Sequence, residues 1–288
     1  MTKILILGGS GMLGQTAFRT LAVDARYEVY ASVRSAAQAN SFAPNLQNRI
    51  LTGIDVLDSD SVAACLADLR PDVVINCVGI VKQLQAAADP LTALPVNALL
   101  PHRLSRLCSL INARLIHIST DCVFSGLVGN YREDDKPDAD DLYGRSKLLG
   151  EVCGRNAITL RTSIIGHELS SRNGILEWFL AQTDVVNGYS KAFFSGVTTL
   201  ELSRVIGGLV IPNTELNGIY HVSSSRISKL DLLEIFSEVY HHRINIKAVD
   251  HVVIDRSLNS DAFRSMTGYH PPDWTAMITE MRVDGERA

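Results

Sequence analysis

The 288-residue sequence has no apolar run of the roughly 18–20 residues needed to span a bilayer. It has no excess of positive charge, since 27 Lys and Arg stand against 31 Asp and Glu, which excludes a bulk attraction to nucleic acid. Its five cysteines are odd in number and lack CxxC spacing, so neither a disulfide framework nor a zinc site is indicated. No charged leader with a small-residue cleavage site precedes the first apolar run. We therefore expect a cytoplasmic protein with reduced thiols, no metal, and neither nucleic acid nor membrane as a partner.

A glycine-rich turn, residues 8–14 (GGSGMLG), stands near the N-terminus. It follows an apolar run that predicts a buried strand, and it opens a stretch, residues 12–23, that predicts a helix. Glycines let the backbone approach a pyrophosphate closely, and a helix N-terminus offers unpaired N–H groups to the anion. A tight turn without a ligand is the alternative. The favoured prediction is a phosphate cradle formed by Gly8, Ser10, Gly11, Met12, Leu13 and Gly14.

An acidic residue is missing at the end of the predicted second strand, where Asp or Glu binds the ribose 2′-hydroxyl of NAD. Ser32 and Arg34 stand there instead and can donate hydrogen bonds to a 2′-phosphate. We therefore expect NADP(H) to be preferred over NAD(H); the alternative is that Arg34 is only a surface charge. Asp55 and Val56, at the end of the predicted third strand, are expected to flank the adenine, although Asp55 could equally be a strand-end cap.

Predicted strands and helices alternate over the first 166 residues, which indicates an α/β fold with a parallel sheet. The expected class is a Rossmann-type doubly wound parallel sheet with a smaller C-terminal substrate-binding part. Residues 1–166 form the expected dinucleotide-binding domain, to which 199–223 return, and 167–288 form mainly the substrate-binding part. The expected strands are 3–7, 28–33, 49–56, 72–78, 114–119, 157–165 and 218–222. The main expected helices are 12–23, 59–69, 93–112, 143–156, 175–182, 199–210 and one that begins at 228.

A phenol and an ammonium stand four residues apart, at Tyr143 and Lys147, in a stretch predicted to be helical. Side chains at i and i+4 share a helix face, so we expect Lys147 to lower the pKa of Tyr143 toward neutrality. Tyr143 can then exchange a proton with a carbonyl or alcohol oxygen while a nicotinamide exchanges hydride at the carbon. Lys147 can also hold the nicotinamide ribose. Thr120, at the end of the fifth predicted strand, is the expected third member, with Ser119 as the fallback; a solvated Tyr/Lys pair is the alternative.

Several stretches resemble the extended short-chain dehydrogenase/reductase superfamily, namely the glycine-rich turn, residues 76–79 (NCVG), residues 119–121 (STD) and the Tyr143/Lys147 pair. Within it, residues 119–126 (STDCVFSG), 143–151 (YGRSKLLGE), 160–163 (LRTS) and 218–223 (GIYHVS) look like the dTDP-4-dehydrorhamnose reductase family. The resemblance implies an enzyme that reduces the 4-keto group of a nucleotide-linked deoxyhexulose with a nicotinamide cofactor, in nucleotide-sugar biosynthesis for surface polysaccharide. It also implies a homodimer formed through the helices near 93–112 and 140–156.

The resemblance also implies roles for single residues. Thr120, Tyr143 and Lys147 would be the catalytic triad. The further cofactor contacts would be Cys77, Val78, Gly79, Thr162 and Ser163. The candidate substrate contacts are Asp121, Cys122, Asn173 and Trp178. For Trp178, the sequence favours a place in the helix core over stacking on a base.

The sequence departs from that family at two places. Cys122 stands where relatives usually have an aromatic residue, and residues 195–199 (SGVTT) lack the proline of the usual Gly-x-Pro-Thr. We therefore expect an altered nucleotide-sugar pocket. Two alternative functions stay open. One is an epimerase–reductase, because Cys122 falls where the related GDP-fucose synthase branch has an acid/base cysteine; a buried apolar role is the plainer interpretation. The other is a non-catalytic dinucleotide-binding regulatory subunit, which the presence of Tyr143 and Lys147 disfavours.

Overall fold

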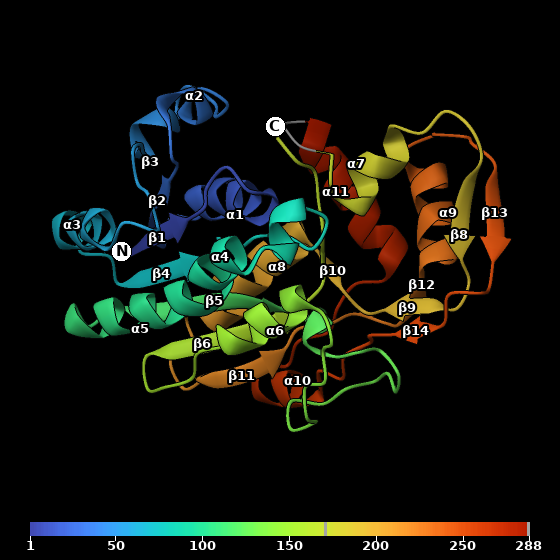
Figure 1. The fold of residues 1–288 in the computed structure, drawn as a ribbon. Helices are drawn as coiled ribbons and strands as arrows, with labels where there is room; N and C mark the ends of the chain where they lie inside the picture. The colour runs from blue at the N-terminus through green and yellow to red at the C-terminus, as the bar shows by residue number, and fades with distance from the viewer. Residues whose placement is uncertain (170–171, 287–288) are drawn as a thin grey trace.

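The computed structural model describes residues 1–169 and 172–286. Its centre is a seven-stranded sheet in the order β3-β2-β1-β4-β5-β6-β11, in which every neighbouring pair is parallel (Figure 1). The order reverses between β1 and β4, which is where doubly wound sheets place a ligand at the carboxyl ends of the strands. The strands of the sheet are β1 (Thr2–Leu7), β2 (Tyr27–Ser32), β3 (Ile50–Leu51), β4 (Val73–Asn76), β5 (Arg114–Thr120), β6 (Ala157–Thr162) and β11 (Gly218–His221).

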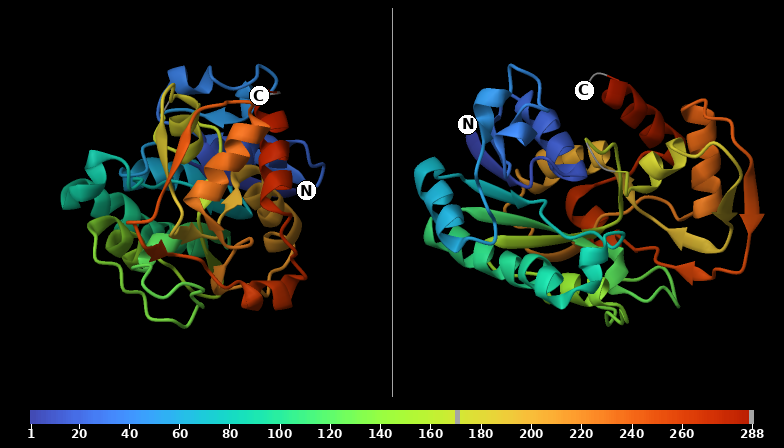
Figure 2. Two further views of the ribbon diagram at one scale, coloured as in Figure 1. Left: turned by 90° about the vertical axis from the view of Figure 1, so that its right-hand side faces the viewer. Right: turned by 45° about the horizontal axis from the view of Figure 1, so that its top comes forward.

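Helices cover both faces of the sheet (Figures 1 and 2). On one face α1 and α8 pack against Ile4 and Ile6, and on the other α3 and α5 pack against Leu5 and Leu7. A strand turns successive side chains to opposite faces, so an unbroken apolar run needs cover on both. The doubly wound α/β fold predicted from the sequence is therefore confirmed. The helices beside the sheet are α1 (Met12–Ala22), α2 (Ala36–Ala39), η1 (Gln47–Arg49), α3 (Ser59–Leu69), η2 (Gln85–Ala88), α4 (Pro90–Ala93), η3 (Leu94–Leu99), α5 (Leu100–Leu110), η4 (Asp121–Val123), α6 (Leu142–Leu149), α8 (Thr199–Val205) and η5 (Ile206–Val210).

The chain leaves the sheet after β6, returns to it as β11 and leaves it again, and the segments before and after β11 add elements outside the central sheet (Figure 1). Three small sheets form there, β10-β7, β12-β9-β14 and β13-β8. The apolar core on the α1 and α8 side continues into α7, α9 and α11 without a break. These elements are β7 (Ile164–Ile165), α7 (Ile175–Leu180), β8 (Val186–Tyr189), β9 (Ala192–Phe194), β10 (Val197–Thr198), β12 (Ile227–Ser228), α9 (Lys229–Val239), β13 (Ile246–Val249), β14 (Ile254–Asp255), α10 (Asp261–Thr267) and α11 (Trp274–Glu286).

Two elements are shorter than the sequence predicts, and glycine explains both. The predicted strand 49–56 forms only over Ile50–Leu51, because Gly53 adopts φ +77° and turns the chain. The predicted helix 143–156 ends at Leu149, and Gly150 is its C-cap. A Cβ at Gly150 would lie 1.9 Å from the Asn97 carbonyl oxygen, so the end of α6 packs directly on a neighbouring backbone.

Two further elements are interrupted. The sequence predicts a kink or a restart of the helix 93–112 at Pro95 and Pro101, and the structure builds this stretch from α4, η3 and α5. Pro95 lies in η3, where the hydrogen-bond pattern widens to that of a π-helix, and Pro101 lies in the first turn of α5. The predicted strand 157–165 breaks at Ser163, whose carbonyl accepts a hydrogen bond from the Val197 N–H (2.9 Å). After that break β7 pairs with β10 instead of continuing the central sheet.

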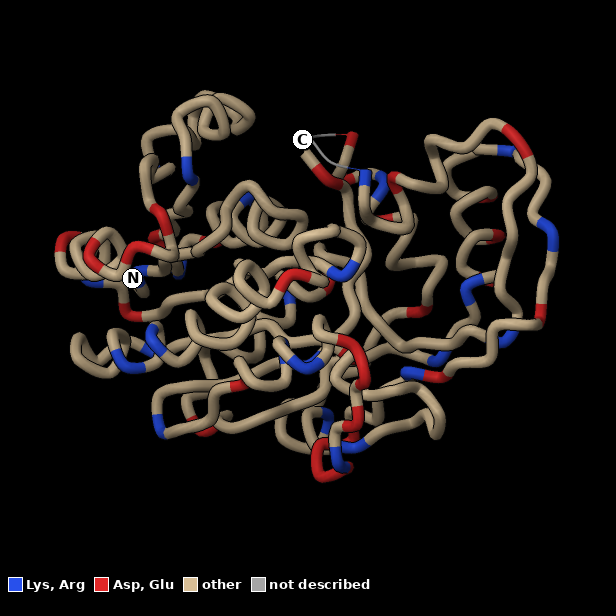
Figure 3. The backbone as a smooth tube through the Cα atoms, in the orientation of Figure 1, with Lys and Arg blue, Asp and Glu red and all other residues tan. Residues whose placement is uncertain are grey.

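Charges of both signs are interspersed over most elements (Figure 3). Among the described residues, no helix combines the length and the apolar character that crossing a membrane requires.

Candidate active site

The glycine-rich turn lies between β1 and α1, at the point where the strand order reverses. Gly8 has φ +83°, and a Cβ there would lie 3.0 Å from Val78 Cγ2. A Cβ at Gly14 would lie 2.1 Å from the Gly8 carbonyl oxygen, so only glycine lets α1 pack so closely on the turn. Gly11 is the N-cap of α1, and the first N–H groups of a helix have no intrahelical acceptor. The residues present therefore fit a dinucleotide pyrophosphate.

The end of β2 offers the groups expected near an adenosine 2′-phosphate. Ser32 is buried at the end of the strand, and Arg34 is exposed just beyond it. Gln38 joins this segment to the glycine-rich turn: its side-chain oxygen accepts from the Arg34 N–H (3.0 Å), and its amide donates to Ser10 Oγ (3.2 Å). The sequence prediction missed Gln38. Its place could have been predicted from the sequence, because a Gln three residues after a Ser is the pattern of a capping box, and Ser35 and Gln38 form one.

Asp55 and Val56 lie beyond the end of the short strand β3, not at the end of a long strand as predicted. The Asp55 carboxylate accepts a hydrogen bond from the Leu57 N–H (2.9 Å), in the turn that precedes α3. Val56 is half-buried and packs against the core on the α3 and α5 face. Asp55 therefore does act as a cap, which was the alternative role for it. That Asp55 and Val56 flank an adenine stays a prediction.

Thr120, Tyr143 and Lys147 meet where β5 ends and α6 begins. The Thr120 hydroxyl donates to the Asp121 carboxylate (3.1 Å) and accepts from the Cys122 N–H (3.1 Å), and the Thr120 side chain acts on the neighbouring Tyr143 phenol in the direction that lowers its pKa. Lys147 is buried one helical turn after Tyr143, and its ammonium donates to the Ile118 carbonyl (2.7 Å). Asp141 starts α6 by accepting the Gly144 N–H (2.7 Å), which fixes the helix that carries Tyr143 and Lys147.

The pKa of Tyr143 runs opposite to the sequence expectation. Burial, followed by the negative potential of Cys122 and of Asp121, raises the pKa of Tyr143 above its ordinary value, and the Thr120 side chain only partly offsets this. Burial also lowers the pKa of Lys147, to about 8. The expectation that Lys147 brings the pKa of Tyr143 toward neutrality is therefore wrong. At neutral pH Tyr143 carries its proton, which is the form needed to donate to an oxygen.

Ser119 points away from this cluster. Its hydroxyl donates to the Glu151 carboxylate (2.7 Å), because successive side chains of β5 face opposite sides of the sheet. Of the two hydroxyls proposed from the sequence, Thr120 is the one beside Tyr143.

The further predicted cofactor contacts lie on either side of Lys147 and Thr120. A Cβ at Gly79 would lie 3.8 Å from Lys147 Nζ, which brings the segment after β4 next to the ammonium. Cys77 precedes it, and its N–H donates to the Leu7 carbonyl (3.1 Å) at the start of the glycine-rich turn. On the other side, Thr162 is paired in register with Thr120. Ser163 follows it where β6 breaks.

The C-terminal part contributes two cations that the sequence prediction missed. Asp121 is buried, which raises its pKa, and the positive charges of Arg256 and Lys229 act against that shift. Lys229 is the first residue of α9, and Arg256 follows β14 and donates to the Phe124 carbonyl (2.9 Å). No spacing in the sequence links residues more than a hundred positions apart, so only the fold could bring these cations to the end of β5. Cys122 is half-buried beside them, and burial raises the pKa of its thiol to about 12.

The remaining two candidate substrate residues lie at α7. Asn173 is half-buried just before this helix, next to Gly174, where a Cβ would lie 2.9 Å from Met12 Cε. The segment of Asn173 therefore adjoins the glycine-rich turn. Trp178 is 39% exposed, and Leu176 and Phe179 are the buried residues of α7. The interpretation of Trp178 as a core residue is wrong, while base stacking stays a prediction.

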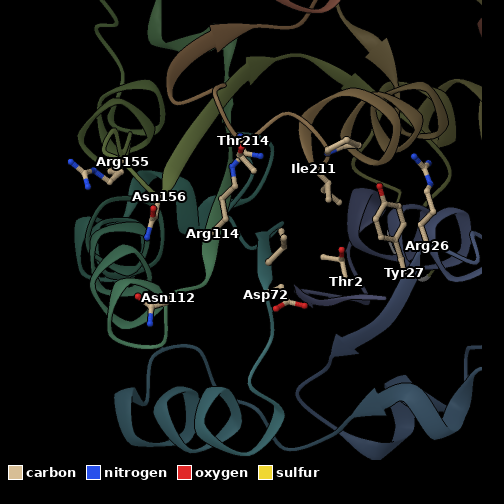
Figure 4. A pocket seen from close by; sticks show the side chains of 12 residues that line it. Thr2, Arg26, Tyr27, Asp72, Asn112, Arg114, Arg155, Asn156, Ile211 and Thr214 are labelled. Carbon is tan, nitrogen blue, oxygen red and sulfur yellow. The ribbon is translucent and has the colours of Figure 1, made fainter.

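A cavity of about 540 Å³ lies at the opposite, amino edge of the sheet (Figure 4). Arg114 reaches into its centre, but its guanidinium donates to the backbone carbonyls of Val210 and Leu216. The cation is thus used to join the start of β5 to the connection that leads into β11. This cavity lies away from the Thr120/Tyr143/Lys147 cluster and does not belong to the candidate site.

Comparison with known proteins identifies the family. The family model described as the RmlD substrate binding domain matches residues 1–283. The chain belongs to this family. A probable low-salt glycan biosynthesis reductase of Haloferax volcanii is 31% identical to this RmlD-family chain over 81% of it and 79% of the relative. A dTDP-4-dehydrorhamnose reductase of Aggregatibacter actinomycetemcomitans is 25% identical over 99% of the chain and 100% of the relative. The resemblance stated from the sequence is thereby confirmed.

The fold of this RmlD-family chain also matches solved structures. A dTDP-4-dehydrorhamnose reductase from Bacillus anthracis, solved in complex with NADP, superposes with a TM-score of 0.79. The match covers 99% of this chain and 100% of that one at 20% sequence identity. At this identity the likeness establishes the shared architecture.

Proposed function

We propose that this chain is an NADP(H)-dependent reductase that acts on the 4-keto group of a nucleotide-linked deoxyhexulose, in nucleotide-sugar biosynthesis for surface polysaccharide. One observation carries the proposal: a protonated Tyr143, next to Thr120 and one helical turn before Lys147, lies at the carboxyl ends of the strands beside a glycine-rich turn that fits a dinucleotide. The membership in the RmlD family and the relative named as a glycan biosynthesis reductase support the substrate class.

The residues of the site divide the work of a carbonyl reduction. The nicotinamide, when bound, supplies a hydride to the keto carbon. Tyr143 donates its proton to the keto oxygen as negative charge develops there, and Thr120 orients that oxygen through its hydroxyl. Lys147, held by the Ile118 carbonyl, places a positive charge beside Gly79, where it can hold the cofactor ribose and favour loss of the phenol proton.

An assay of NADPH oxidation over a panel of 4-keto nucleotide sugars, varied in the nucleotide and in the sugar, tests this function. We expect oxidation with at least one 4-keto-6-deoxyhexulose, observed as loss of absorbance at the reduced nicotinamide band. Binding of NADPH without turnover on any member of the panel would favour the regulatory-subunit alternative instead. Conversion of a sugar into its epimer before reduction would favour the epimerase–reductase.

The epimerase–reductase alternative finds little support at Cys122. An acid/base cysteine needs a thiolate that forms near neutral pH, whereas burial and the neighbouring Asp121 raise the pKa of this thiol to about 12. We therefore keep the reductase as the proposal and treat Cys122 as a small residue that widens the pocket.

The preference for NADP(H) is proposed on Arg34, which is exposed at the end of β2 where no carboxylate stands. Replacing Arg34 with Ala is expected to weaken NADPH binding about 10-fold, since one charge-assisted hydrogen bond to a phosphate is lost. NADH has no 2′-phosphate, so its affinity is expected to stay within about 2-fold. Fluorescence titration of both cofactors measures this, with Arg155→Ala at the amino edge of the sheet as the matched control. Equal losses for both cofactors in Arg34→Ala would contradict the assignment.

We also propose a division of the chain into two binding parts, a homodimer and a cytoplasmic location, as expected from the sequence. Residues 1–166 with 199–223 would bind the dinucleotide, and 167–288 would mainly bind the sugar nucleotide. A homodimer would form through the helices near 93–112 and 140–156, where Leu99 of η3, Leu110 of α5 and Leu149 of α6 are exposed. A cytoplasmic location is in keeping with the five free cysteines.

A further inference from the structure

A buried ion pair lies directly behind the Thr120/Tyr143/Lys147 cluster. Arg161 donates to the Glu151 carboxylate through two nitrogens, Nε (2.8 Å) and Nη2 (2.8 Å), and the two side chains are only 3% and 4% exposed. The third donor to this carboxylate is Ser119 Oγ (2.7 Å). Both carboxylate oxygens are therefore occupied, and the geometry is the bidentate form that holds a guanidinium most firmly.

The surroundings of Arg161 complete this arrangement. Its guanidinium lies over the Phe124 ring, 5.2 Å from the centroid, and Nη1 contacts His221 Nε2 at 3.2 Å. Burial and Arg161 lower the pKa of His221 to about 4, so the imidazole is neutral and its Nε2 can accept. Its Nδ1 then donates to the Tyr131 carbonyl (3.0 Å). The donors of Arg161 are thus matched by acceptors on Glu151 and His221, while the Phe124 ring covers a face of the guanidinium.

This ion pair joins the elements that carry the catalytic side chains. Glu151 follows the last turn of α6, four residues after Lys147. Ser119 and Arg161 are partners in register on β5 and β6, one residue before Thr120 and Thr162. The Glu151 carboxylate accepts hydrogen bonds from both partners, so it fixes α6 against the two strand ends at which the reaction takes place.

A buried ion pair joins a helix to a sheet at a large cost in desolvation free energy. Well-packed apolar side chains of similar volume often give equal or greater stability, because desolvation of both ions offsets their attraction. Stability alone is therefore a weak reason for this pair. Glu151 follows Lys147 by four residues, just past the end of the same helix, and its charge acts on Lys147 in the direction that favours the ammonium, which indicates an electrostatic role.

We propose that Glu151, locked by Arg161 and Ser119, is a positioning residue that fixes α6 against β5 and keeps Lys147 cationic. The proposal rests on the function proposed above, since it assigns Lys147 to that reaction. The other groups that face Lys147 cannot supply the negative charge: Cys77 carries a thiol whose pKa burial raises to about 12, and His117 is buried and neutral. Tyr143, one turn earlier on α6, is protonated at neutral pH.

The test is a pH titration of Lys147 by NMR in the full chain labelled with ¹³Cε-lysine. The chain has seven lysines, so the spectrum is small, and a Lys147→Arg variant assigns the signal. In the wild type we expect a midpoint near the pKa of about 8. Glu151→Gln removes a negative charge that acts on Lys147 and leaves Arg161 positive, so the ammonium loses its proton at lower pH, with a midpoint lower by about one unit. The alkaline limb of the kcat/KM profile should move by the same amount.

Glu201→Gln is the matched control, because it removes a buried carboxylate on α8 that acts on Tyr269 instead of Lys147. It should leave the Lys147 midpoint in place. If Glu151→Gln does not fold, Glu151→Asp takes its place. The shorter Asp side chain keeps the negative charge but holds it farther from Lys147, so a smaller downward shift of the Lys147 midpoint is expected. An unchanged midpoint in either folded variant would overturn the proposal. The titration needs no turnover, so failure to oxidise NADPH with any keto sugar would refute the proposed function without deciding the role of Glu151.

Discussion

Replacing Tyr143 with Phe is expected to lower turnover at least about 10²-fold, because the site loses the group that donates a proton to the keto oxygen. The substitution removes one oxygen atom and keeps the ring that is packed at the start of α6. Affinity for NADPH should therefore change by less than about 2-fold, corresponding to less than about 0.5 kcal/mol. Stopped-flow measurement of NADPH oxidation with the active keto sugar, together with a cofactor titration, separates the two effects.

Tyr189→Phe is the control for this prediction. Tyr189 lies at the end of β8, where its ring contacts His251, and β8 pairs with β13 in a small sheet of the C-terminal part. We expect turnover close to that of the wild type in this variant. Unchanged turnover in Tyr143→Phe would remove Tyr143 from the reaction and with it the proposed proton transfer.

Replacing Arg161 with Leu is expected to lower the free energy of unfolding by about 3–5 kcal/mol, which is the usual cost of leaving one member of a buried ion pair without its partner. In this variant the Glu151 carboxylate keeps only the Ser119 hydroxyl as a donor in the buried space between α6 and β6. Urea unfolding followed by circular dichroism measures the change. The result would be contradicted by a loss smaller than about 1 kcal/mol, the range of exposed ion pairs.

The double variant Glu151→Leu/Arg161→Leu distinguishes the interaction free energy of the ion pair from the contributions of the two single side chains. Because it buries no charge, we expect it to be more stable than Arg161→Leu alone, with a coupling free energy above about 1 kcal/mol. Equal instability of the single and double variants would indicate that the leucines fail to pack, and Arg161→Met, which is longer and more flexible, would then replace Arg161→Leu.

Most of the central sheet, the glycine-rich turn and the Tyr143/Lys147 pair could be predicted from local patterns in the sequence. The glycine-rich turn, the alternation of strands and helices, and the i, i+4 spacing of Tyr143 and Lys147 each depend on neighbouring residues only. The end of α6 was misjudged by seven residues, because the close approach of Gly150 to the Asn97 backbone comes from packing and leaves no periodic pattern.

The electrostatics of the site were not predictable in the same way. A lysine four residues after a tyrosine lowers the phenol pKa only if the ammonium lies close to the phenol and burial of the phenol does not outweigh its charge. Here Lys147 turns to the Ile118 carbonyl, and burial dominates the pKa of Tyr143. Lys229 and Arg256 likewise act on Asp121 from elements that only the folded chain brings near.

Because β11 comes late in the sequence and pairs with β6, the central sheet cannot be completed until more than two thirds of the chain has been synthesised. Until residue 221 is available, β6 is an edge strand whose outer backbone groups have no partner. Arg161, at the end of that strand, would also lack its His221 contact. A ribosome-bound or proteolysed chain that stops near residue 166 therefore presents a bare, largely apolar strand with a charge beside it, which is a surface that chaperones bind and that pairs readily with other copies.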